Sequence, residues 1–148
     1  AECDKFGNIN VSRFGPKIAG CGGFINITQT APVVVYCGTF TAKGLKENIG
    51  NGKLEIVEEG KIKKFKQEVE QITFAAEYAA EIGQKVLYVT ERAVFELRNG
   101  VFTLTEIAPG VDLEKDVLGQ MEFRPAIAED LKLMDARLFT DEIMGLKA

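Results

Sequence analysis

The feature that most constrains the fold is an Asn-Gly pair between two apolar segments with alternating side chains. Asn99-Gly100 follows "AVFELR" and precedes "VFTLTEIA". Asn-Gly is the dipeptide that best suits a two-residue hairpin turn, because both of its residues adopt positive φ readily. The sequence therefore predicts an antiparallel hairpin with strands at 94–97 and 102–107, and a third strand at 85–90 from "KVLYVTE".

A second apolar run, "VVVYC" at 33–37, has no polar residue to mark a solvent face. This pattern is typical of a strand that is covered on both faces in an α/β sheet, and it predicts that Cys37 is a small core residue. One helix is predicted in the alanine-rich segment that Gly83 ends. Another should begin after Asp112 as its N-cap and run to about Met121. The polar stretch "TAKGLKENIGNGK" predicts a loop or a small excursion.

The first residues predict the end of one strand, a turn at 4–8, and a second strand that contains Ile9 and Val11. A domain rarely begins in the last residues of a hairpin's first strand. We therefore expect a single-domain fragment, residues 1–148, of a longer protein.

Three glycines lie within four positions, at Gly20, Gly22 and Gly23, with Cys21 among them. The spacing does not match the dinucleotide fingerprint, because G-x-G-x-x-G requires glycine where Ile25 stands. It does not match a P-loop either, since no Lys-Ser/Thr pair follows. Two interpretations stay open on local grounds: a tight structural turn, or a loop whose bare backbone a ligand approaches.

Composition excludes several classes of function. The chain of 148 residues has no histidine, so it contains no Ser-His-Asp triad and no His-ligated zinc. Its three cysteines are widely spaced and fit reduced thiols. The net charge of −4 gives no nucleic-acid footprint, and the longest apolar run is too short for a bilayer. We predict a cytoplasmic protein without a metal site, a nucleic-acid partner or a membrane span.

Two charged pairs are ambiguous. Glu91-Arg92 interrupts apolar strand sequence and predicts either a solvent-facing pair at a bend or a partly buried ion pair. Asp135 and Arg137 allow the same two interpretations. Neither pair forms a self-sufficient catalytic set.

Larger segments of the chain resemble a known family. These are "GNINVSRFGPKIAGCGGFINITQTAPVVVYCGTFTAKGL", "KVLYVTERAVFELRNGVFTLTEIAPGVDLEKDVLGQMEF" and "LKLMDAR". They are similar to the C-terminal part of family I coenzyme A transferases, with the best match to the acetate, propionate and short-chain 3-oxoacid group. "VTERAVF" with "EIAPGVDLEKD" is a specific combination, and the resemblance is weakest around 44–68.

The resemblance implies an α/β fold: an open, mostly parallel sheet with flanking helices and an antiparallel hairpin, truncated at its N-terminus. This chain would be the C-terminal part of the catalytic (beta) half. It also implies that "FINITQTA" is helical. Expected partners are acyl-CoA, a short-chain carboxylate, the N-terminal (alpha) half of the same enzyme, and a second copy in a homo-oligomer.

The resemblance further implies ping-pong chemistry in which a glutamate carboxylate attacks the thioester and then carries CoA as a glutamyl thioester. That glutamate lies in a Ser-Glu-Asn/Val-Gly-type motif upstream of this chain. Glu47 is not assigned to the role, although "ENIG" is superficially similar, because it follows the glycine loop. No catalytic residue is therefore expected here. Gly22 and Gly23, with Gly20, match the family's G-x-G-G loop and would bind CoA's thioester and its oxyanion. CoA would be a substrate, with no permanent cofactor.

Two other functions remain possible at this point. An acyl-CoA hydrolase could use the same glutamyl chemistry with water as the acceptor. The chain could also be a non-catalytic subunit-interaction domain on the same scaffold.

Overall fold

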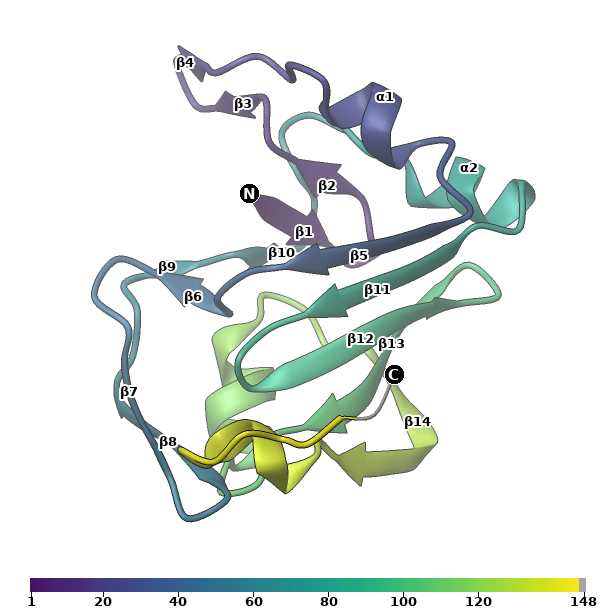
Figure 1. Cartoon of the computed structure of the whole chain (residues 1–148). Coiled ribbons are helices and arrows are strands. Elements are labelled where there is room, and N and C mark those ends of the chain that lie inside the picture. Colours follow the sequence, from purple (N-terminus) through teal and green to yellow (C-terminus); the bar gives the residue numbers. More distant parts are fainter. Residues whose placement is uncertain (147–148) are drawn as a thin grey trace.

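The computed structural model describes residues 1–146, and its centre is a five-stranded sheet in the order β14-β13-β12-β11-β5 (Figure 1). The strands are β5 Val33–Cys37, β11 Lys85–Val89, β12 Ala93–Arg98, β13 Val101–Ile107 and β14 Ala126–Leu133. The first four confirm the predicted strands to within one residue at each end. The fifth, β14, lies in a segment for which no secondary structure was predicted.

The central sheet is mixed, which corrects the expectation that it is mostly parallel. β5–β11 and β13–β14 pair in parallel, whereas β11–β12 and β12–β13 pair antiparallel. The reason is the length of the connections, because strands joined by a few residues can only turn back on themselves. β11 and β12 are joined by residues 90–92, and β12 and β13 by the predicted Asn99-Gly100 turn. Asn99 and Gly100 have φ of 51° and 76°, as that turn requires.

A smaller N-terminal sheet packs on one face of the central sheet. It has the order β10-β1-β2, from Phe65–Lys66, Glu2–Asp4 and Ile9–Asn10. The predicted turn at 4–8 is confirmed, and the Asp4 carboxylate accepts the N–H groups of Phe6 and Asn8, both at 3.0 Å. Short two-stranded ribbons complete the β structure: β3 Arg13–Phe14 with β4 Lys17–Ile18, β6 Thr41–Ala42 with β9 Ile62–Lys63, and β7 Lys46–Gly50 with β8 Lys53–Glu58.

The polar excursion is therefore a β-hairpin, β7–β8. It turns at Asn51 and Gly52, which have φ of 53° and 74°. This second Asn-Gly pair carries the same signal as the first, but the polar residues around it hide the alternation. Leu54 on β8 is buried at the base of the hairpin, where its N–H donates to the Pro109 carbonyl at 2.9 Å.

The helices are short. α1 is Phe24–Thr28 and α2 is Ala76–Glu81, and both lie at one end of the central sheet (Figure 1). Asp112 caps a helical segment as predicted, because its carboxylate accepts the Lys115 N–H at 2.7 Å. That segment is a π turn, Leu113–Val117, followed by a 3-10 turn, Leu118–Gln120, and a further 3-10 turn spans Ala136–Phe139. Within residues 1–146, no helix has the length and apolar character to cross a membrane.

Two apolar clusters lie on opposite faces of the central sheet. The larger fills the face beneath the N-terminal sheet, where the rings of Phe95 and Phe102 stack with centroids 4.7 Å apart. The smaller lies on the other face, and its buried members are Leu54, Val94, Ala108, Met134 and Phe139.

The smaller cluster covers only part of its face. Val33 and Val35 on β5 are 54% and 52% exposed, and Cys37 is also exposed. The expectation that 33–37 is covered on both faces, with Cys37 in the core, is therefore wrong for the described structure. The run is apolar on both sides, but no element within residues 1–146 lies over the outer one.

Candidate functional site

The glycine loop connects β4 to α1 at the surface, near the two α-helices (Figure 1). Gly20 and Gly22 have φ of 76° and 52°, a region that side chains rarely adopt. Gly23 has φ −83° and is the N-cap of α1, so a change of sign occurs between Gly22 and Gly23. Alternation of this kind turns successive N–H groups toward one side, where they can hold an anion.

Hydrogen bonds divide the three glycines into two groups. The N–H of Gly20 donates to the Ser12 carbonyl at 3.2 Å, beside the N–H of Ala19 at 2.8 Å, and these bonds hold the start of the loop against the segment between β2 and β3. The N–H groups of Gly22 and Gly23 donate to no acceptor within residues 1–146. Two adjacent donors are therefore open to a ligand.

The space around the loop gives separate reasons for the glycines. A Cβ on Gly20 or Gly22 would meet nothing within 4 Å, so their positive φ is what favours glycine there. A Cβ on Gly23 would lie 3.5 Å from Ile27 Cδ1, an ordinary contact. Gly23 has neither a positive φ nor a crowded neighbour, so the described structure itself gives no reason for glycine at this position.

A cavity of about 180 Å³ opens beside the loop. Ile18, Ile25 and Ile72 give it apolar walls, and Gly20, Cys21 and Gln71 also line it. Across it lie Ser12 and Thr73, whose hydroxyl groups are 2.8 Å apart and bond each other. None of the described residues that line it is Lys or Arg.

The Glu91-Arg92 ambiguity is resolved in favour of a buried ion pair. The Arg92 side chain is completely buried, and its Nε donates to Glu91 Oε1 at 2.6 Å. Its Nη1 and Nη2 form a fork onto Glu59 at 2.6 and 3.1 Å, and Nη1 also reaches the Asp116 carbonyl at 2.9 Å. This network, Glu59–Arg92–Glu91, ties the β11–β12 turn to the end of β8 and to the π turn.

Each carboxylate of the network has further donors. Glu91 accepts the Phe40 N–H at 2.8 Å, and Glu59 accepts the Thr41 hydroxyl and the Gly60 N–H. Burial on its own would raise the pKa of Glu59, but the hydrogen bonds from Arg92 and Thr41 outweigh it, so the pKa is lowered. Each charged group of the network is thus hydrogen-bonded within the protein, which indicates a structural role.

Glu47 lies on β7, and Figure 1 shows β7 well away from α1 and the glycine loop that precedes it. Its Oε2 is buried and has no hydrogen-bond partner within the described chain. Burial, and then the negative charge of Glu91, raise the pKa of Glu47, with Arg92 opposing. The structure thus separates Glu47 from the glycine loop. Asp135 and Arg137, by contrast, form a local pair at the surface, with Nη2 and Oδ2 2.5 Å apart.

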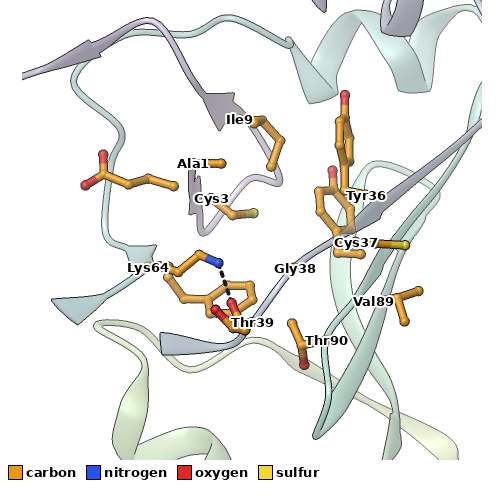
Figure 2. Close-up of a pocket in the computed structure, with 13 residues that line it drawn as sticks. Ala1, Cys3, Ile9, Tyr36, Cys37, Gly38, Thr39, Lys64, Val89 and Thr90 are labelled. Carbon is orange, nitrogen blue, oxygen red and sulfur yellow. Dashed lines mark hydrogen bonds between the residues drawn. The ribbon is translucent and has the colours of Figure 1, made fainter. Parts of the chain in front are cut away.

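A second cavity, of about 70 Å³, lies where the carboxyl ends of the parallel strands β5 and β11 meet the N-terminal sheet (Figure 2). Tyr36, Cys3 and Ile9 give it a mainly apolar lining, and Lys64 donates to the Thr39 carbonyl. Burial lowers the pKa of Lys64, with Glu91 opposing. Ligands often bind at the carboxyl ends of parallel strands. This cavity has room for only a few water molecules, so the glycine loop is the stronger candidate for a large ligand.

Comparison with solved structures defines the class. The chain superimposes on acyl-CoA transferase YdiF of Escherichia coli O157:H7 with a TM-score of 0.96 at 52% identity, over 99% of this chain and 28% of that one. A more distant likeness, to glutaconate CoA-transferase of Acidaminococcus fermentans, has a TM-score of 0.63 at 17% identity, over 92% of this chain and 50% of that one, and bears on the fold alone. The chain has the fold of a segment of the CoA-transferases, which confirms the fold class.

Sequence comparison identifies particular relatives. The chain is 55% identical to caffeate CoA-transferase of Acetobacterium woodii and 53% identical to acetate CoA-transferase YdiF of Escherichia coli O157:H7. The matches cover 99% and 98% of this chain but only 29% and 27% of those proteins. No model of a known protein family matches. The predicted resemblance is confirmed: the chain is homologous to a segment that spans less than a third of these CoA-transferases.

Sequence reasoning found the glycine loop but missed what surrounds it. Ile72 follows Gly23 by 49 positions, and alanine-rich sequence follows it, so no local pattern links it to the loop. The same is true of Glu59, whose bond to Arg92 spans 33 positions.

Proposed function

We propose that this chain supplies the thioester-facing loop of an enzyme that transfers CoA between a short-chain acyl-CoA and a carboxylate. The observation that carries the proposal is 53–55% identity to CoA-transferases over almost the whole chain. The two unoccupied N–H groups at Gly22 and Gly23 support it, because oxyanion stabilisation requires preorganised donors at an open backbone. A solved structure of YdiF is a thioester complex with CoA, which is consistent with the same chemistry.

The loop acts at the step in which a carboxylate attacks the thioester carbonyl carbon. A C–O bond forms and the carbonyl π electrons move to oxygen, where the N–H groups of Gly22 and Gly23 donate to the negative charge. The C–S bond then breaks, CoA leaves as the thiolate, and an acyl-glutamyl anhydride remains. The thiolate attacks the glutamyl carbonyl, releasing the acyl group as a carboxylate and leaving a glutamyl-CoA thioester.

The three glycines are assigned two different roles. Gly22 and Gly23 are assigned as the donors. Gly20 is assigned to the shape of the loop, because its N–H is already bonded to Ser12. The nucleophilic glutamate is assigned to a part of the enzyme outside this chain. Glu47 is too far from the loop to serve, and its neighbours Glu91 and Arg92 form a closed network of their own.

The test uses the full-length enzyme that carries this chain, supplied with acetyl-CoA and with or without propionate. Propionyl-CoA formation, and a glutamyl-CoA thioester trapped by borohydride, are the expected results. Hydrolysis of acetyl-CoA at the same rate without propionate would favour the hydrolase. No reaction in either arm would favour the non-catalytic interaction domain. Trapping at Glu47 would overturn the placement of the nucleophile.

The remaining expectations stay predictions that this proposal includes. They are the N-terminal (alpha) half as partner, self-association as a homo-oligomer, a short-chain carboxylate as acceptor, and a cytoplasmic location.

A further inference from the structure

The names of the relatives leave the acyl group open. Caffeate CoA-transferase and acetate CoA-transferase YdiF match this chain at 55% and 53% identity, so overall identity does not distinguish an aromatic from a two-carbon acyl group. The choice has to be made by side chains at the site. The cavity beside the glycine loop is the place where this chain can contribute them.

The lining of that cavity selects against a charged or strongly polar occupant. Ile18, Ile25 and Ile72 present hydrocarbon, and the Ser12 and Thr73 hydroxyl groups already bond each other at 2.8 Å. Thr73 Oγ1 also accepts the Val11 N–H at 3.2 Å. Phosphate groups would find no Lys or Arg among the described lining residues, and Gln71 is the one lining side chain that offers an amide to a polar group.

The position of the cavity fits the acyl side of a thioester. Gly20 and Cys21 line it, and Gly22 and Gly23 follow directly in the chain with their open N–H groups. A carbonyl group held by those N–H groups would have its alkyl substituent within reach of the isoleucines. The cavity volume of about 180 Å³ exceeds the roughly 150 Å³ of an apolar cavity known to hold benzene, so an acyl chain of about six carbons has room.

We propose that the isoleucine-lined cavity between the glycine loop and residues 71–73 holds the acyl chain of the thioester, and that Ile25 and Ile72 set its length. This rests on the proposed CoA transfer. Ile25 comes from α1 and Ile72 from the segment that leads into α2, so the cavity has one wall on each side. Shortening either isoleucine side chain should admit a longer acyl chain, and replacing one by a larger side chain should exclude a longer acyl chain.

The experiment compares kcat/KM for acetyl-CoA, hexanoyl-CoA and octanoyl-CoA in the full-length enzyme. Ile25→Ala and Ile72→Ala should raise the octanoyl-to-acetyl ratio about tenfold, and Ile72→Phe should lower the hexanoyl-to-acetyl ratio by a similar factor. The two isoleucines are 42% and 56% exposed, so truncation leaves the core intact. Ile25→Val and Ile72→Val, which each remove one methylene group, should shift the ratio the same way by less.

Ile82→Ala is the matched control, because Ile82 is 47% exposed and does not line the cavity. It should leave every ratio unchanged. If the wild-type enzyme transfers CoA but the Ile25 and Ile72 variants keep its ratios, the acyl assignment is overturned and the proposed function stands. If the wild-type enzyme transfers CoA from none of the three donors, the proposed function fails and the assignment fails with it.

Discussion

Replacing Arg92 by Met tests whether the buried network stabilises the fold. Methionine keeps a long unbranched side chain but removes the four hydrogen bonds that Arg92 donates to Glu91, Glu59 and the Asp116 carbonyl. Removing one partner of a buried ion pair typically costs about 3–5 kcal/mol. The Glu59 and Glu91 side chains remain 25% and 12% exposed and can be partly rehydrated, so we expect about 3 kcal/mol, the lower end of the range.

Urea unfolding followed by circular dichroism measures the change. With an m-value of about 2 kcal/mol/M, the midpoint should fall by about 1.5 M. The control is Arg124→Met, since Arg124 makes a similar fork onto Glu114, at 2.8 and 3.2 Å, with both side chains exposed. Exposed pairs contribute little, so this control should leave the midpoint where it is.

The pH dependence of the stability difference between Arg92→Met and the wild type gives a second test. The lowered pKa of Glu59 means that wild-type stability from this group is fully present above the unfolded-state pKa, and is lost as pH falls through the folded-state pKa. In Arg92→Met the Glu59 carboxylate has lost its cation, so protonating it relieves the defect. The difference between the variant and the wild type should therefore shrink as pH falls from 7 toward 4. Equal midpoint changes for Arg92→Met and Arg124→Met, or a difference independent of pH, would refute the reasoning.

Three further predictions concern other parts of the chain. Gly22→Val should lower CoA transfer by the full-length enzyme about a hundredfold by blocking the thioester. Gly15→Val, at a similar φ of 58°, should impose the same strain of about 1–2 kcal/mol without that loss of rate. Glu47→Gln should raise the urea midpoint at pH 7 and leave it unchanged at pH 4. The reason is that a raised pKa gives stability below the unfolded-state value that is lost as pH rises through the folded-state value. Leu54→Ala should lower stability by about 3–5 kcal/mol in urea unfolding, and a loss below 1 kcal/mol would contradict its role in the smaller cluster.

The sequence predicted elements whose signals are local. Alternation on both sides of Asn99-Gly100 was enough to place β12 and β13, and the Asp112 cap was found because it acts within three residues. The expectation of a mostly parallel sheet was wrong because β11 and β12, joined by only three residues, pair antiparallel, and this consequence was not drawn from the predicted strands at 85–90 and 94–97. The exposed outer side of β5 was missed because an apolar run carries no information on which of its faces another element covers.

In the candidate site, too, the features with local sequence signals were predicted and their tertiary partners were not. The density of glycines identified the loop, but the distinction between Gly20 and its neighbours depends on the Ser12 carbonyl, eight residues earlier. The Glu91-Arg92 pair was noticed in the sequence, but its further partner Glu59, just after β8, was not. Local composition can thus indicate where chemistry or charge lies, while its partners are set by the tertiary fold.

The two apolar clusters on opposite faces of the central sheet have a consequence for hydrogen exchange. The smaller one joins the β7–β8 hairpin to the 3-10 turn at 136–139, through Leu54 and Phe139 and the bond from the Gly52 N–H to the Phe139 carbonyl. These segments can open together while the stacked rings beneath the N-terminal sheet stay packed. Their amide protons should then exchange as one sub-global unit, with a lower opening free energy than the amides of β12 and β13.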